Sequence, residues 1–191
     1  MGAHTVQMKA VYLVNDPKVA AILVDPMRRA ILDLLRQRPM TQARLANELG
    51  LSAPSLSFHM KRLRAKKLVI VVKREIEKHR IMQTFFASAA YLFIYDLESM
   101  PKNIARYFYP ISLERARSIL SASSVFNATE KFSVNYTSIE INKLAEDISR
   151  LLVKTAKHYQ NKEVEYGEEK VVIDIYKRCI NLVNSRKLGS T

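Results

Sequence analysis

The segment "TQARLANELGLSAPSLSFHMKRL" (residues 41–63) constrains the fold more than any other part of the chain. Thr41 and Ser52 can each accept a hydrogen bond from a free backbone N–H group, so both are typical N-cap residues of a helix. Gly50 stands between them and can adopt the left-handed conformation that ends a helix. Two short helices joined by a tight glycine turn form a helix-turn-helix.

The spacing of small and apolar residues in this segment suits two crossing helices. Ala46, four residues before Gly50, is small enough for close helix contact, and Leu56, six residues after it, can reach back into the same core. Leu56, Met60 and Leu63 form a stripe at spacings of four and three, which is one face of a helix. We expect the second helix to bury this stripe.

Helices precede this unit, and a β-hairpin follows it. Asp-Pro pairs at residues 16–17 and 25–26 predict helix starts, because the carboxylate caps free N–H groups and proline has no N–H to leave unpaired. Residues 68–76 and 79–88 are rich in β-branched and aromatic side chains, which predicts two paired strands. No glycine marks the tip, so we expect a loop longer than a two-residue turn. This order of elements is that of a winged helix.

The pattern beyond residue 101 is mostly helical. We expect a helix that starts at a Ser112 cap, a helix over residues 138–160 and a last helix after Gly167. Residues 123–138 are rich in Ser, Asn and Thr and predict a loop or a short strand.

The expected fold class is therefore mostly α with a small β-hairpin. We expect a winged helix-turn-helix domain at residues 10–95, followed by a largely helical C-terminal domain at residues 96–191.

The composition argues against several classes of protein. The chain is 48% hydrophobic and 26% charged, which is typical of a soluble globular protein. Its longest apolar-rich run, residues 85–95, is shorter than the roughly 20 residues of a membrane span, and the amino terminus lacks the pattern of a signal peptide. We expect a cytoplasmic, nucleoid-associated protein without a membrane segment.

Cofactor and enzyme motifs are absent from the sequence. The single cysteine, Cys179, lies on the apolar side of a helical segment and is expected to be a buried thiol. The four histidines show no ligand spacing, and there is no glycine-rich phosphate loop or nucleophile signature. We expect no cofactor, no metal site and no enzymatic activity.

Positive charge is concentrated in the first half of the chain. Residues 1–90 hold 16 of the 31 Lys and Arg but only 6 of the 18 Asp and Glu, so their surplus is 10 of the formal net charge of +13. The amino-terminal half is therefore the candidate for contact with a polyanion.

Residues 16–88 resemble a known family. They follow the approximate pattern "DP-x-R-x-x-I-L-x-L-L", then "L-A-x-x-L-G-L-S-x-x-x-V-S-x-H-L-x-x-L", then "G-L-V" and a basic hairpin. This pattern is similar to the winged-helix domain of ArsR-like regulators, especially the archaeal relatives. The resemblance implies a DNA-binding transcriptional regulator that works as a homodimer. The Cys-x-Cys of the metal-sensing branch is missing, and His59 stands at the family's usual, partly buried histidine position, where we expect a structural role.

The helix over residues 52–66 is then expected to lie in the major groove of double-stranded DNA, with the basic hairpin on the backbone or in the minor groove. The expected DNA-binding residues are Thr41, Gln42, Arg44, Ser52, Ala53, Ser55, Ser57, Phe58, Lys61, Arg62, Arg64, Lys73, Arg74, Lys78, His79 and Arg80.

Two of these positions depart from the family's pattern. Position 53 is often a hydrogen-bonding residue and position 58 is often histidine, whereas this chain has Ala53 and Phe58. Neither side chain can read a donor or an acceptor, but both could touch a thymine methyl group. We expect base readout with few hydrogen bonds, and Phe58 could instead fold back onto the protein.

Two features of the second half stay open. Leu144, Ile148, Leu151 and Tyr159 are either a dimer surface or an internal core contact. The aromatic-rich residues 91–110, together with later helices, could form a pocket for an unknown small-molecule effector. Two other functions are also open: a general architectural, chromatin-like nucleic-acid binder, and a protein-interaction module. The basic hairpin argues against the interaction module.

Overall fold

The helix starts of the amino-terminal half lie at the capping residues that the sequence predicts. The computed structural model describes residues 7–76, 82–126, 138–165 and 170–188. Its first elements are β1 (Gln7–Val14), α1 (Pro17–Leu23), α2 (Pro26–Gln37), α3 (Gln42–Leu49) and α4 (Ala53–Ala65).

Each of these helices begins with a side-chain cap. The carboxylates of Asp16 and Asp25 accept hydrogen bonds from the second backbone N–H after them at 2.8 and 2.9 Å. Thr41 and Ser52 accept from the third N–H after them, both at 3.3 Å. Gly50 ends α3 with φ of 64°, as predicted for the turn between α3 and α4.

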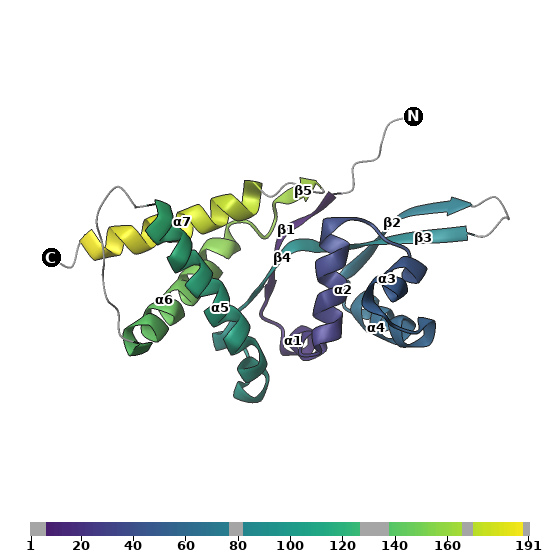
Figure 1. The fold of residues 1–191 in the computed structure, drawn as a ribbon, viewed down its shortest axis with the longest axis horizontal. Coiled ribbons are helices and arrows are strands. Elements are labelled where there is room, and N and C mark those ends of the chain that lie inside the picture. The colour runs from purple at the N-terminus through teal and green to yellow at the C-terminus, as the bar shows by residue number, and fades with distance from the viewer. Residues whose placement is uncertain (1–6, 77–81, 127–137, 166–169, 189–191) are drawn as a thin grey trace.

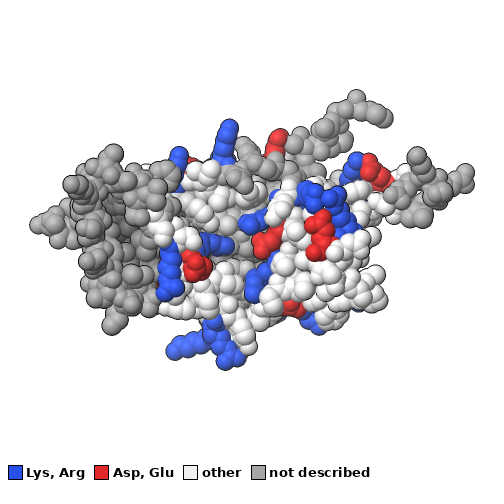
Figure 2. All heavy atoms as spheres, viewed as in Figure 1, with Lys and Arg blue, Asp and Glu red and all other residues white. Residues whose placement is uncertain are grey.

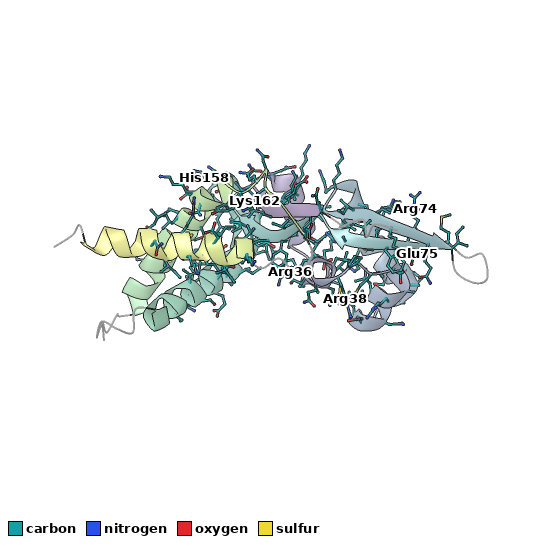
Figure 3. The ribbon with its side chains drawn as sticks, turned by 90° about the horizontal axis from the view of Figure 1, so that it is seen from above. Arg36, Arg38, Arg74, Glu75, His158 and Lys162 are labelled. Atoms are coloured by element: carbon teal, nitrogen blue, oxygen red, sulfur yellow. The ribbon has the colours of Figure 1, made fainter. Side chains whose placement is uncertain are left out.

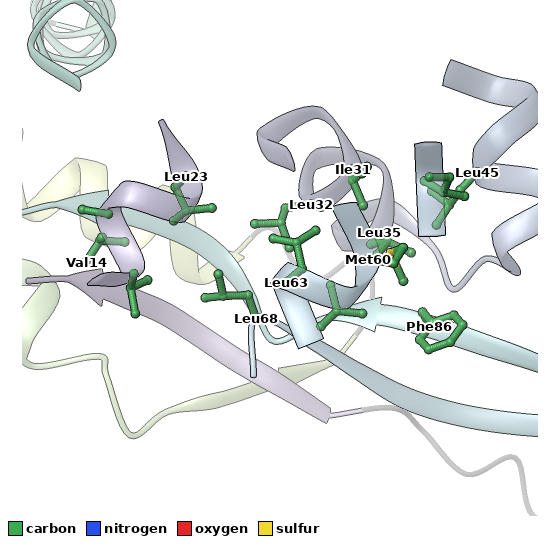
Figure 4. Close-up of a cluster of buried hydrophobic side chains, with 14 of the residues drawn as sticks. Val14, Leu23, Ile31, Leu32, Leu35, Leu45, Met60, Leu63, Leu68 and Phe86 are labelled. Carbon is green, nitrogen blue, oxygen red and sulfur yellow. The ribbon is translucent and has the colours of Figure 1, made fainter. Parts of the chain in front are cut away.

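The predicted stripe of α4 is buried. Leu56, Met60 and Leu63 are at most 1% exposed and pack in one cluster with residues of α1, α2 and α3 (Figure 4). The wing follows as β2 (Val69–Ile76) and β3 (Met82–Ser88), an antiparallel hairpin with an irregularity between Val71 and Lys73. Its predicted long tip, residues 77–81, lies outside the described residues.

A second, three-stranded sheet joins the two halves of the chain. β4 (Ala90–Tyr95) pairs in parallel with β1, and β5 (Glu163–Glu165) pairs antiparallel on the other side of β1. The strand order is β4-β1-β5, so the amino-terminal strand is central. No local pattern in the sequence predicts this sheet.

The C-terminal half is helical, as expected. After the short 3-10 helix η1 (Leu97–Ser99) come α5 (Lys102–Phe126), α6 (Ser138–Lys157) and α7 (Lys170–Leu188). Figure 1 shows these three helices at one end of an elongated molecule and the wing at the other end. No helix in the described parts of the chain is long and apolar enough to cross a membrane.

The prediction that Ser112 starts a helix is wrong. α5 runs without a break from Lys102 through Pro110, and Ser112 lies inside it with 8% exposure. Phe108 and Ala116, both buried, anchor the helix on either side of the proline, so the loss of one backbone hydrogen bond does not end it. α5 also includes residues 123–126, where a loop or strand was expected, and residues 127–137 lie outside the description.

Two hydrophobic clusters form the core. One lies between the C-terminal helices and the β4-β1-β5 sheet, and the other fills the amino-terminal helices and hairpin. β1, β4 and α5 contribute residues to both clusters. Cys179 is buried in the first cluster, with its Sγ 3.6 Å from Thr155 Oγ1, and burial raises the pKa of its thiol.

Candidate nucleic-acid interface

α4 turns one face into the core and the opposite face to solvent. Leu56, Met60 and Leu63 anchor it. The side chains on its outer face are exposed, with Ser55 partly buried: Ser52, Ala53, Ser55, Ser57, Phe58, Lys61, Arg62 and Arg64. The helix therefore presents most of its predicted DNA-binding residues on one accessible surface.

Phe58 does not fold back into the core. Its side chain is 51% exposed, and the guanidinium of Arg62 lies over its ring with Cζ 4.6 Å from the ring centroid. The ring of His59 meets the Phe58 ring edge-on at 5.7 Å. A cation held over an aromatic face is attracted to it, so Phe58 orients Arg62 on the surface of α4.

His59 links α4 to the start of α2. Its side chain is 13% exposed, and its Nδ1 lies 3.5 Å from Asp25 Oδ2, too far for a hydrogen bond. Asp25 Oδ2 also lies 3.2 Å from the guanidinium of the buried Arg28, whose other terminal nitrogen donates to Ile22 O at 2.7 Å. This position supports the structural role expected for His59.

Arg38, directly after α2, and Arg44 of α3 share one carboxylate. Arg38 and Arg44 both bond to Glu48 Oε1, at 2.7 and 3.3 Å. On the face shown in Figure 2, basic and acidic side chains lie beside one another over this half of the molecule. Arg44 is therefore already paired, and the hydroxyl of Thr41 is already used as the α3 cap.

The wing carries one paired and one unpaired cation among its described residues. Lys73 forms an ion pair with Glu75, and its Nζ lies over the Phe85 ring, 5.8 Å from the ring centroid. Arg74 is exposed and has no ion-pair partner in the described part of the chain (Figure 3). Lys78, His79 and Arg80 lie outside the described residues.

The end of the described hairpin is apolar. Ile76 and Met82 face each other across the two strands and are 70% and 61% exposed. Neither was among the residues expected to bind DNA, although both adjoin the basic tip. The acids of the interface, Glu48 and Glu75, were not expected there either, although their spacings of four from Arg44 and two from Lys73 could have revealed them.

Residues 23–72 match the sequence profile of a family described as a helix-turn-helix domain. The matched segment contains α2, α3, α4 and the start of β2. The β2-β3 hairpin directly follows α4, as the wing of a winged helix does. The amino-terminal part of this chain is a winged helix-turn-helix domain. The winged helix-turn-helix fold predicted from the sequence is thus confirmed.

Several solved structures are similar to this chain. NolR from Sinorhizobium fredii is 30% identical over 38% of this chain and 67% of its own, with a TM-score of 0.33. The homodimeric winged helix-turn-helix DNA-binding domain of Mb0332 from Mycobacterium bovis is 20% identical over 49% of this chain and 71% of its own, with a TM-score of 0.33. The adhesin competence repressor AdcR from Streptococcus pyogenes is 17% identical over 74% of this chain and 84% of its own, with a TM-score of 0.33. No curated protein matches.

The residues expected at a dimer surface lie outside the winged helix-turn-helix domain. Ile148, Leu151 and Tyr159 are 1%, 6% and 6% exposed, in the cluster beneath the β4-β1-β5 sheet. The side chain of Leu144 lies outside the description. For the three described residues, the structure favours the internal core contact over an open surface.

Proposed function

We propose that this protein is a DNA-binding transcription regulator that acts as a homodimer, with α4 in the major groove and the wing on the backbone or in the minor groove. The observation that carries the proposal is the two-sided character of α4. Leu56, Met60 and Leu63 hold it in the core, while Phe58 and Arg62 stand on its exposed face.

The shape of α4 suits a close approach to base edges. The major groove is about 12 Å wide and admits a helix. The first turns of α4 carry only small side chains at Ala53, Ser55 and Ser57, so the helix can lie deep in the groove. Phe58 is then placed to touch a thymine methyl group, and Arg62, held over its ring, to reach a guanine or a phosphate.

The size of the reading element supports a homodimer. One winged helix contacts only a few base pairs, and two copies related by a two-fold axis can read half-sites about 34 Å apart. We assign DNA contact to residues 10–95, and dimerisation with any effector binding to residues 96–191. Strands of both regions pair in the β4-β1-β5 sheet, which connects them.

Genome-wide mapping of the bound protein tests this function. A regulator gives a small number of sharp sites, whereas uniform coverage supports an architectural protein and no recovered DNA supports an interaction module. Arg62→Ala is expected to abolish the sharp sites. Lys177→Ala, which removes an exposed cation of α7, is the matched control and should leave them unchanged.

A further inference from the structure

An open cavity lies where η1 meets α5 and α6, away from the proposed DNA surface. Its volume is about 760 Å³, within the range of about 300–1,000 Å³ that small-molecule sites occupy. The end of β4 and η1 form one wall, and α5 and α6 form the others.

The hydroxyl of Ser112 in α5 lines this cavity and makes no hydrogen bond within the described parts of the chain. It is not one of the buried unpaired polar atoms of the described residues, so it is open to the cavity. Ser112 therefore offers a hydrogen-bonding group to a polar atom of a ligand.

The acidic groups of the cavity are already bonded within the protein. Glu98 Oε1 accepts from Arg150 Nε at 2.8 Å, and Glu146 Oε1 accepts from the Tyr109 hydroxyl at 2.6 Å. The second bond raises the pKa of Tyr109. Asp96 Oδ2 accepts from the Ser99 hydroxyl at 2.9 Å.

Two cations of the cavity are not bonded in this way. Lys154 and Lys157 lie one turn apart on α6 and have no ion-pair partner within the description. Leu97, Leu113 and Val153 give the same cavity an apolar wall. Lys154 and Lys157 are therefore the charged groups of the lining that have no side-chain partner within the description, and they lie beside apolar surface.

We propose that this cavity binds an amphipathic organic anion. The carboxylate or a comparable acidic group lies at Lys154 and Lys157, a polar atom meets the Ser112 hydroxyl, and the apolar body lies against Leu113 and Val153.

The cavity is well placed to influence the DNA-binding half. Tyr95, which lines it, stacks on Phe108 of α5 with ring centroids 4.3 Å apart, and both rings belong to the winged-helix cluster. A ligand held between η1, α5 and α6 thus contacts the elements that join the two clusters. This regulatory role rests on the proposed function, whereas the binding itself does not.

Calorimetric titration of the full chain with octanoate, and with octanol as the uncharged probe of equal length, tests the site. Octanoate should bind about tenfold or more tightly than octanol, because only octanoate can pair with the lysines. Lys154→Ala/Lys157→Ala should remove this preference, and Lys170→Ala/Lys177→Ala, two exposed lysines of α7, should keep it. Equal binding of both probes, or octanoate binding that survives the Lys154/Lys157 change, overturns the proposal.

A second titration separates this inference from the proposed function. DNA affinity is measured with and without saturating octanoate on a fragment recovered from the genome-wide mapping. A change in affinity that disappears in Lys154→Ala/Lys157→Ala supports regulation through the cavity, and an unchanged affinity overturns that role. Absence of DNA binding in both conditions contradicts the proposed function alone, since the calorimetric result is obtained without DNA.

Discussion

Lys67 and Gly50 both occupy the left-handed backbone region, with φ of 54° and 64°. A side chain costs about 1–2 kcal/mol in this conformation, whereas glycine adopts it freely. We expect Lys67→Gly to raise the free energy of unfolding by about 0.5–1 kcal/mol, after the added flexibility of the unfolded chain is subtracted. Gly50→Ala should lower it by about 1 kcal/mol, and this cost is purely conformational, since no atom lies within 4 Å of the added Cβ. Urea unfolding of both variants checks the pair, and a destabilised Lys67→Gly contradicts the argument.

Phe58 is a residue whose two roles can be measured separately. Because its ring is 51% exposed, Phe58→Ala should change the free energy of unfolding by less than about 0.5 kcal/mol. Loss of the methyl contact and of the support for Arg62 should weaken binding to a selected site by about 1–2 kcal/mol. Fluorescence anisotropy and thermal unfolding give the two values. Val71→Ala, an exposed apolar residue of β2, is the control for loss of apolar surface. A destabilised variant with unchanged affinity would show that Phe58 serves the fold.

At the scale of elements, the wing is a basic surface whose positive charge is partly neutralised by Glu75. If about eight phosphates are neutralised per dimer, log affinity should fall with log salt concentration at a slope of roughly −7. Arg74→Ala should reduce the magnitude of this slope by about 2, one unit from each subunit. Glu75→Gln should release Lys73 and both tighten binding and steepen the slope. Anisotropy titrations on a random-sequence duplex at several salt concentrations measure all three proteins. Equal slopes would mean that the wing does not touch the backbone.

The elements also show which parts of the fold a sequence can predict. The caps at Asp16 and Asp25 and the turn at Gly50 are local chemistry, so the amino-terminal helices were predicted with their starts. β1 and β4 are paired across more than 75 residues, as in Lys9 with Ala90, and no local pattern states that pairing. The helix start predicted at Ser112 was wrong because serine, although typical of caps, also occurs inside helices, where tertiary burial overrides propensity. At the interface, the exposed face of α4 followed from its stripe, whereas the ion pair of Arg38 with Glu48, ten residues away, depends on the fold.

At the scale of the whole molecule, β1, β4 and α5 contribute residues to both hydrophobic clusters. A substitution at Leu151 tests whether this residue serves the core or a dimer surface. Leu151 is 6% exposed and packs beneath the sheet whose central strand is β1. We expect Leu151→Ala to lower the free energy of unfolding by about 2–5 kcal/mol, the usual cost of a core truncation, and Leu151→Glu to unfold the C-terminal half. Because β1 and β4 also hold Val14 and Tyr95 of the winged-helix cluster, the loss should extend to DNA binding. Circular dichroism measures the folded state of each variant, and light scattering measures its molar mass. Ile173→Glu, at a residue of α7 that is 49% exposed, is the matched control and should stay folded. If the Leu151→Glu protein is fully folded but monomeric while the parent is dimeric, Leu151 lies at the dimer surface. Leu144, Ile148 and Tyr159 would then be expected at the same surface.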